Sequence, residues 1–121
     1  MGFPESRTGD RSLDHLAEQC GIPAKYIDQL RGVFAGHPQI HTVSLYGSRA
    51  MGTFRPGSDI DLCINADEIE WSEFLAIERE IDDLMLPWKL DLSLWHQIEN
   101  DALKQHIERV GVEFYASARS P

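Results

Sequence analysis

Two aspartates one residue apart, Asp59 and Asp61, interrupt an apolar run that otherwise has the pattern of a buried β-strand. Strand alternation places both on one face, roughly 7 Å apart at Cα, while Ile60, Leu62 and Ile64 point to the other face. Two carboxylates this close and partly buried repel one another, and one of them tends to hold a proton. The pattern therefore predicts that a positive charge binds between them.

A divalent cation is the simplest group that removes this repulsion. Oxygen-only ligands of this kind suit Mg²⁺ or Mn²⁺ rather than zinc, and magnesium is usually held by one or two carboxylates together with substrate phosphates. The residues thus predict a phosphate-bearing ligand. The competing interpretation is a solvated edge strand whose charges discourage aggregation.

The turn that precedes the aspartates has the composition of an anion-binding site. Gly47 lets the backbone approach a phosphate closely, the N–H groups of the turn can form a nest, and the Ser48 hydroxyl adds a donor. If a helix begins after Ser48, its N-terminus faces the same anion. Arg49 and Arg55 carry fork-shaped donors suited to phosphate, although each can instead pair with a surface carboxylate.

A third carboxylate, Asp91, lies in the strictly alternating segment KLDLSLW, residues 89–95. Leu90, Leu92 and Leu94 share one face of that segment, and Asp91 and Ser93 share the other. If this strand neighbours the strand of Asp61, three carboxylates meet. Asp91 would then either hold a second ion or accept a proton from an attacking hydroxyl, and the sequence does not choose between these roles.

Helical and strand patterns alternate along the chain. Helices are expected over residues 12–19, 23–35, 71–86 and 100–110, and strands over 40–46, 59–65, 89–95 and 113–116. This order predicts an α+β fold, a two-layer arrangement in which helices lie mostly on one side of a small mixed sheet. The second and third strands should be parallel because a helix connects them, whereas the relative direction of the first two is left open.

Length and charge restrict the function further. The chain has 121 residues and a formal net charge of −9, which suits one domain over residues 10–121, preceded by a poorly ordered segment 1–9. The acidic surface argues against direct nucleic-acid binding. Cys20 and Cys63 have no metal-type spacing and are interpreted as reduced core thiols, and no segment resembles a membrane span or leader, so a cytoplasmic location is expected. The five histidines are too scattered to form a ligand set.

The segment GSRAMGTFRPGSDIDL followed by LDLS resembles the minimal nucleotidyltransferase family of the DNA polymerase β-like superfamily. The resemblance runs from about Lys25 to Tyr115. It implies a palm-like sheet with flanking helices, and transfer of a nucleoside monophosphate from a nucleoside triphosphate to a hydroxyl. The implied metal ligands and catalytic residues are Asp59, Asp61 and Asp91. The implied nucleotide-binding residues are Gly47, Ser48, Arg49, Arg55 and Ser58.

The same resemblance suggests a partner. Many small members of the family are similar to antitoxins that pair with a helical HEPN protein, and some adenylylate that partner. The expected function is therefore Mg²⁺-dependent transfer of AMP from ATP to a HEPN protein, within a homo- or hetero-oligomer. The alternative is a binding module that masks the HEPN protein by contact, without catalysis.

Overall fold

A four-stranded mixed sheet forms the centre of the molecule. The computed structural model describes residue 13 and residues 15–117, and the sheet comprises β1 (Ile40–Tyr46), β2 (Ile60–Ala66), β3 (Leu90–Leu94) and β4 (Val112–Ala116) in the order β3-β2-β1-β4. β2 and β3 are parallel, whereas β1 is antiparallel to both of its neighbours. The expected mixed sheet and the parallel pair are confirmed, and β1 and β2 prove to be antiparallel.

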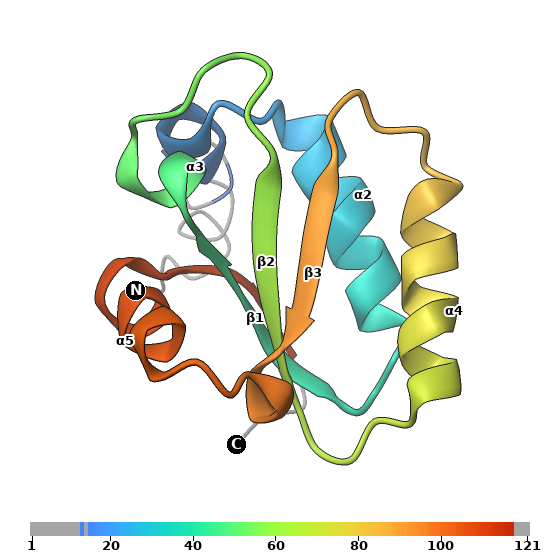
Figure 1. The fold of residues 1–121 in the computed structure, drawn as a ribbon. Coiled ribbons are helices and arrows are strands. Elements are labelled where there is room, and N and C mark those ends of the chain that lie inside the picture. Colours follow the sequence, from blue (N-terminus) through green and yellow to red (C-terminus); the bar gives the residue numbers. More distant parts are fainter. Residues whose placement is uncertain (1–12, 14, 118–121) are drawn as a thin grey trace, which may run out of the picture.

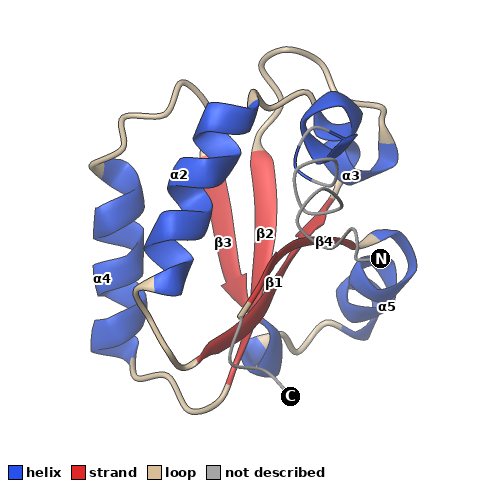
Figure 2. Cartoon of the chain, turned by 180° about the vertical axis from the view of Figure 1, so that it is seen from behind, coloured by secondary structure: helices blue, strands red, loops and turns tan. Residues whose placement is uncertain are grey.

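Helices cover both faces of this sheet. Helices α2 (Ala24–Ala35) and α4 (Trp71–Asp82) lie on one face, and α5 (Asp101–Val110) lies on the other (Figures 1 and 2). The short helix α3 (Ser48–Met51) follows β1, and a 3₁₀ turn, η1 (Trp95–Gln97), follows β3. Residues 15–20 are also helical. The expectation that helices lie mostly on one side holds for α2 and α4, whereas α5 occupies the opposite face.

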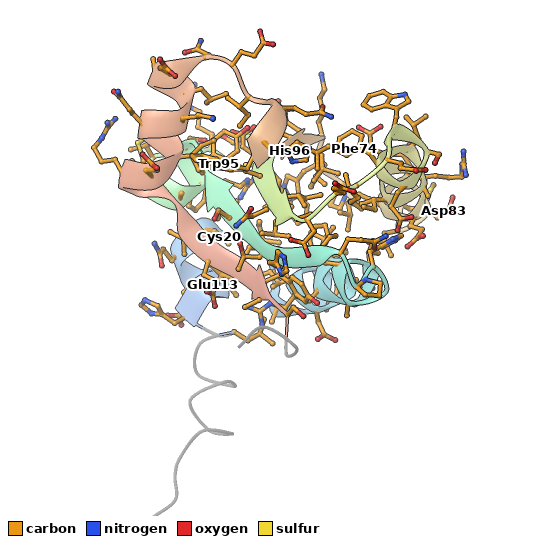
Figure 3. The ribbon with its side chains drawn as sticks, turned by 90° about the horizontal axis from the view of Figure 1, so that it is seen from below. Cys20, Phe74, Asp83, Trp95, His96 and Glu113 are labelled. Atoms are coloured by element: carbon orange, nitrogen blue, oxygen red, sulfur yellow. The ribbon has the colours of Figure 1, made fainter. Side chains whose placement is uncertain are left out.

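The alternation of side chains along the strands explains why helices pack on both faces of the sheet. Ile60, Leu62 and Ile64 alternate along β2 and are fully buried in the main core beneath α2 and α4. Tyr46 and Cys63 point to the opposite face and form a smaller buried cluster with Ile107 of α5. Figure 3 shows from below the sheet between the helices on its two sides, with Phe74 on α4 and Trp95 near α5.

Several element boundaries differ from those expected, most of them by one residue, and two of these differences are described here. α4 ends at Asp82 rather than residue 86, and Met85 follows with a φ of 57°, the single positive φ among the described non-glycine residues. A left-handed residue cannot continue a helix, so the chain turns before Pro87. β2 begins at Ile60, which leaves Asp59 just ahead of the strand.

Two expectations concern residues at or near the N-terminus. The segment 1–9, and residues 12 and 14 of the helix expected over 12–19, lie outside the described residues. Within the described part of the chain, no helix has both the length and the apolar character needed to cross a bilayer.

Candidate active site

The strand register places two of the predicted carboxylates side by side. Asp61 of β2 and Asp91 of β3 are direct partners in the parallel pair. Their Cα atoms therefore lie about 4.8 Å apart, and their side chains project from the same face of the sheet. Tyr46, the last residue of β1, is the partner of Asp61 on its other side. The end of β1, Asp61 and Asp91 therefore share one end of the sheet.

Gly47 joins the turn to this carboxylate. It has a φ of 75°, and a Cβ built on it would overlap the Asp61 carboxylate, whose Cγ would lie at 3.2 Å. Only glycine satisfies both conditions, since other residues rarely adopt that φ and all of them carry a Cβ. The Gly-Ser turn and Asp61, predicted as separate halves of one site, are thus in contact.

The carboxylates also affect one another electrostatically. Burial raises the pKa of Asp61, and the negative charges of Asp91 and Asp59 raise it further, while His106 opposes the rise. Asp61 is half-buried, whereas Asp59 and Asp91 are exposed. The repulsion expected from the sequence is therefore present and centres on Asp61.

The expected three-carboxylate ligand set is only partly assembled. Among the residues that the structure describes, no group of three or more His, Cys, Asp and Glu side chains could by itself hold a metal ion. Asp61 and Asp91 are register partners in β2 and β3, whereas Asp59 precedes β2 and is not among the paired residues. The donor set nevertheless fits magnesium, because that ion is usually held by one or two carboxylates with substrate phosphates completing its shell.

The side chain of Arg49 is not among the groups that face the carboxylates. It is 1% exposed, and its guanidinium donates to the carbonyls of Cys20 (2.8 Å), Pro56 (3.1 Å) and Ser58 (3.1 Å). It also lies 5.0 Å from the ring centroid of Phe54. The fork-shaped donors recognised in the sequence are thus used by the protein's own carbonyls, and any contact of Arg49 with phosphate is left to its backbone N–H.

The remaining candidate phosphate ligands lie on the turn itself. Ser48 begins α3 and is half-buried, and the first N–H groups of a helix have no partner within it. Arg55 is exposed. Its N–H donates to the Ser58 hydroxyl at 2.8 Å, and the Ser58 N–H donates to the Arg55 carbonyl at 2.9 Å. Ser58 therefore shapes the turn, while the Arg55 side chain remains accessible to a ligand.

Three further residues surround the carboxylates and were not predicted. The Tyr46 hydroxyl lies 3.5 Å from the Ser93 hydroxyl, and burial raises the pKa of Tyr46, with Asp91 and Asp61 adding to the rise. His106 of α5 lies edge-on to the Tyr46 ring at 6.2 Å. The position of Tyr46 directly before Gly47 could have indicated that it lies near the site. Nothing in the sequence distinguished His106 from the other histidines.

A cavity of about 270 Å³ lies on the same face, farther along β2. Its lining includes Cys63, Asn65, Trp95 and Ile107. Burial raises the pKa of Cys63 to about 11, so that thiol remains protonated at neutral pH. This agrees with its interpretation as a reduced core residue.

Comparison with known proteins identifies the arrangement. The family model described as "Polymerase beta, Nucleotidyltransferase" matches residues 28–120, which includes the turn and all three aspartates. The chain belongs to this nucleotidyltransferase family. No curated protein matches it.

Solved structures share the fold of this nucleotidyltransferase domain. A toxin–antitoxin structure with AMP-PNP superposes with a TM-score of 0.62 and 18% identity, over 77% of this chain and 75% of the other. A tri-AMPylated HEPN toxin in complex with MNT antitoxin, from Shewanella oneidensis, superposes with a TM-score of 0.57 and 15% identity, over 76% of this chain and 71% of the other. A nucleotidyltransferase from Sulfolobus solfataricus, described as putative, superposes with a TM-score of 0.51 and 16% identity, over 99% of this chain and 94% of the other.

Proposed function

We propose that this chain is a Mg²⁺-dependent nucleotidyltransferase that transfers AMP from ATP to a hydroxyl on a HEPN-type partner protein. The observation that carries the proposal is the contact between Gly47 and Asp61, together with the register of Asp61 beside Asp91. The AMP-PNP and AMPylated HEPN complexes among the similar structures support the choice of nucleotide and partner.

The transfer step uses the residues at this end of the sheet. The acceptor oxygen attacks the α-phosphorus and forms a new P–O bond, while the bond between the α-phosphorus and the bridging oxygen breaks and pyrophosphate leaves with that electron pair. The hydroxyl proton passes to the Asp91 carboxylate or, where Asp91 is a metal ligand, to solvent water. The backbone of Gly47 and Ser48, with the Arg55 side chain, holds the β- and γ-phosphates. Asp59, Asp61 and Asp91 are the proposed ligands for Mg²⁺, which when bound neutralises charge on the phosphates.

Asp91 has one of two roles, proton acceptor or metal ligand, and the variant Asp91→Asn distinguishes them. If its carboxylate accepts the hydroxyl proton, Asp91→Asn lowers kcat by about 10²–10⁴-fold and leaves the Mg²⁺ requirement of nucleotide binding unchanged. If Asp91 is a metal ligand, the same variant raises the Mg²⁺ concentration needed for nucleotide binding. Calorimetric titration with ATP at several Mg²⁺ concentrations, beside a rate assay, measures both quantities.

Labelling of the partner tests the proposal as a whole. The chain is incubated with the protein encoded by the neighbouring reading frame, Mg²⁺ and ATP labelled at the α-phosphate. We expect label on the partner that is lost with Asp61→Ala and retained with Asp83→Ala, an exposed acid beyond the end of α4. A partner that is neutralised without label, by the wild type and by Asp61→Ala alike, would instead make the chain a masking module.

A further inference from the structure

The outer edge of β3 carries backbone groups that point away from the sheet. β3 is an end strand, and no strand in the described part of the chain pairs with its outer side. The Lys89 carbonyl accepts from the Ile60 N–H at 2.9 Å and so points toward β2. Because the direction alternates along a strand, the N–H and C=O groups of Leu90 and Leu92 point outward.

A groove between the outer edge of β3 and the C-terminal half of α4 is defined by residues of both elements. Two cavities of about 490 and 180 Å³ share Ile81, Asp82 and Leu90 in their linings and so adjoin one another. Leu92 adds apolar surface, and Glu78 adds a second carboxylate. Outward backbone groups beside a partly apolar groove are what an added strand requires, since main-chain hydrogen bonds supply affinity and alternate side chains enter the groove.

Charge decides which occupant fits. Lys89 lines one end of the larger cavity, but Glu78 and Asp82 lie along the wall that α4 contributes, and the whole chain carries a net charge of −9. A second copy paired edge to edge would bring these acids against their own equivalents, which is unfavourable. A basic segment of another protein meets complementary charge.

The opposite face of the same strand holds Asp91. Successive side chains of an added strand would point to opposite faces of the sheet. Every second side chain would enter the groove, and the others would lie on the face that carries Asp91 and Ser93. That face is where the acceptor hydroxyl of the transfer step must be. We propose that the outer edge of β3 binds an extended basic segment of the partner protein as an additional strand, and that a hydroxyl on its alternate side is the acceptor. The acceptor half of this proposal rests on the proposed function.

Binding of a defined peptide tests the docking half without nucleotide or metal. The probe is a fluorescent heptapeptide that alternates Arg or Leu with Tyr or Thr, and its controls have the same sequence with Glu for Arg, or with N-methylated backbone at alternate residues. We expect the basic peptide to bind, and we expect neither the Glu peptide nor the N-methylated peptide to bind. The double variant Glu78→Lys/Asp82→Lys should weaken it by about tenfold or more, whereas Asp83→Lys, which lies outside the cavity linings, should not.

The outcomes separate the two halves of the proposal. Equal binding of the N-methylated peptide, equal weakening by Asp83→Lys, or no preference over the Glu peptide would overturn docking at this edge. Dimerisation in ultracentrifugation that the peptide reverses would make a second copy the occupant. If the peptide binds as expected but gains no label from ATP and Mg²⁺, while the partner protein does, then docking stands and the acceptor assignment is wrong. Circular dichroism confirms that each variant is folded.

Discussion

Gly47 and Gly52 offer a matched pair at the residue scale, because both have positive φ and only one touches the carboxylates. Their φ values are 75° and 80°, but a Cβ on Gly52 meets nothing within 4 Å. Both alanine variants should lose about 1 kcal/mol from backbone strain. We expect Gly47→Ala alone to abolish detectable ATP binding, because its methyl group displaces the Asp61 carboxylate. Calorimetry with ATP and Mg²⁺, beside urea denaturation, checks this, and equal ATP binding by the two variants would contradict it.

Arg49 and Arg55 form a second pair, in which one guanidinium is buried and the other is exposed. Arg49→Met leaves the carbonyls of Cys20, Pro56 and Ser58 without their donor, so it should cost about 2–4 kcal/mol of unfolding free energy. Arg55→Met should change unfolding by no more than about 0.5 kcal/mol and should weaken ATP binding. Urea denaturation and calorimetry measure the two effects. A stable Arg49→Met protein would show that its carbonyl contacts contribute little.

At the element scale, His37 joins the start of β1 to α4. Its Nδ1 lies 2.5 Å from a Glu73 oxygen and its Nε2 lies 3.1 Å from a Glu80 oxygen. Burial lowers the pKa of His37, but the hydrogen bonds and charges of the two glutamates outweigh burial and raise it overall. Because the folded state binds this proton more tightly than the unfolded chain, the ion pairs stabilise the fold fully below about pH 6.5. That stabilisation is lost as the pH rises through the folded pKa.

Urea denaturation from pH 5 to pH 9 measures this dependence. The wild type should lose on the order of 1 kcal/mol across the range, and His37→Gln should remove that part of the slope. His41→Gln is the control, since His41 pairs with Asp67 at 2.7 Å but the two side chains are 41% and 74% exposed, far more than that of His37. An unchanged slope in His37→Gln would show that the helix-to-strand junction does not depend on this proton.

At the scale of the whole molecule, we expect the carboxylates of the site to lower the stability of the free chain, because burial and neighbouring charges raise the pKa of Asp61. Under the proposed function, the repulsion around Asp61 is relieved when Mg²⁺ and ATP bind. Asp61→Asn should therefore stabilise the free protein by about 0.5–1 kcal/mol. The wild type should gain about 2.7 kcal/mol from ATP and Mg²⁺ at a hundred times the Kd, whereas Asp61→Asn should gain none. Thermal unfolding with and without ligand measures both, and a variant still stabilised by ATP would place the nucleotide elsewhere.

The sequence by itself determined the order of the main elements and indicated the chemistry that we propose for the site. Alternating leucines and isoleucines defined β2 and β3, and the carboxylates between them could face only the side away from the main core, because the side-chain period of a strand is two. The aspartates were recognisable because charged side chains are unfavourable in a buried strand, and the Gly-Ser turn was recognisable because it directly precedes them in the sequence.

Only the tertiary structure decided which of these groups meet. The register of β2 against β3 brought Asp61 beside Asp91, and the antiparallel pairing of β1 brought Gly47 against Asp61. The burial of Arg49 and the approach of His106 depend on residues far away in the sequence, from Cys20 to α5. Local patterns carry no information about such long-range packing, because they record how one residue relates to its own segment and not which other segment lies across from it.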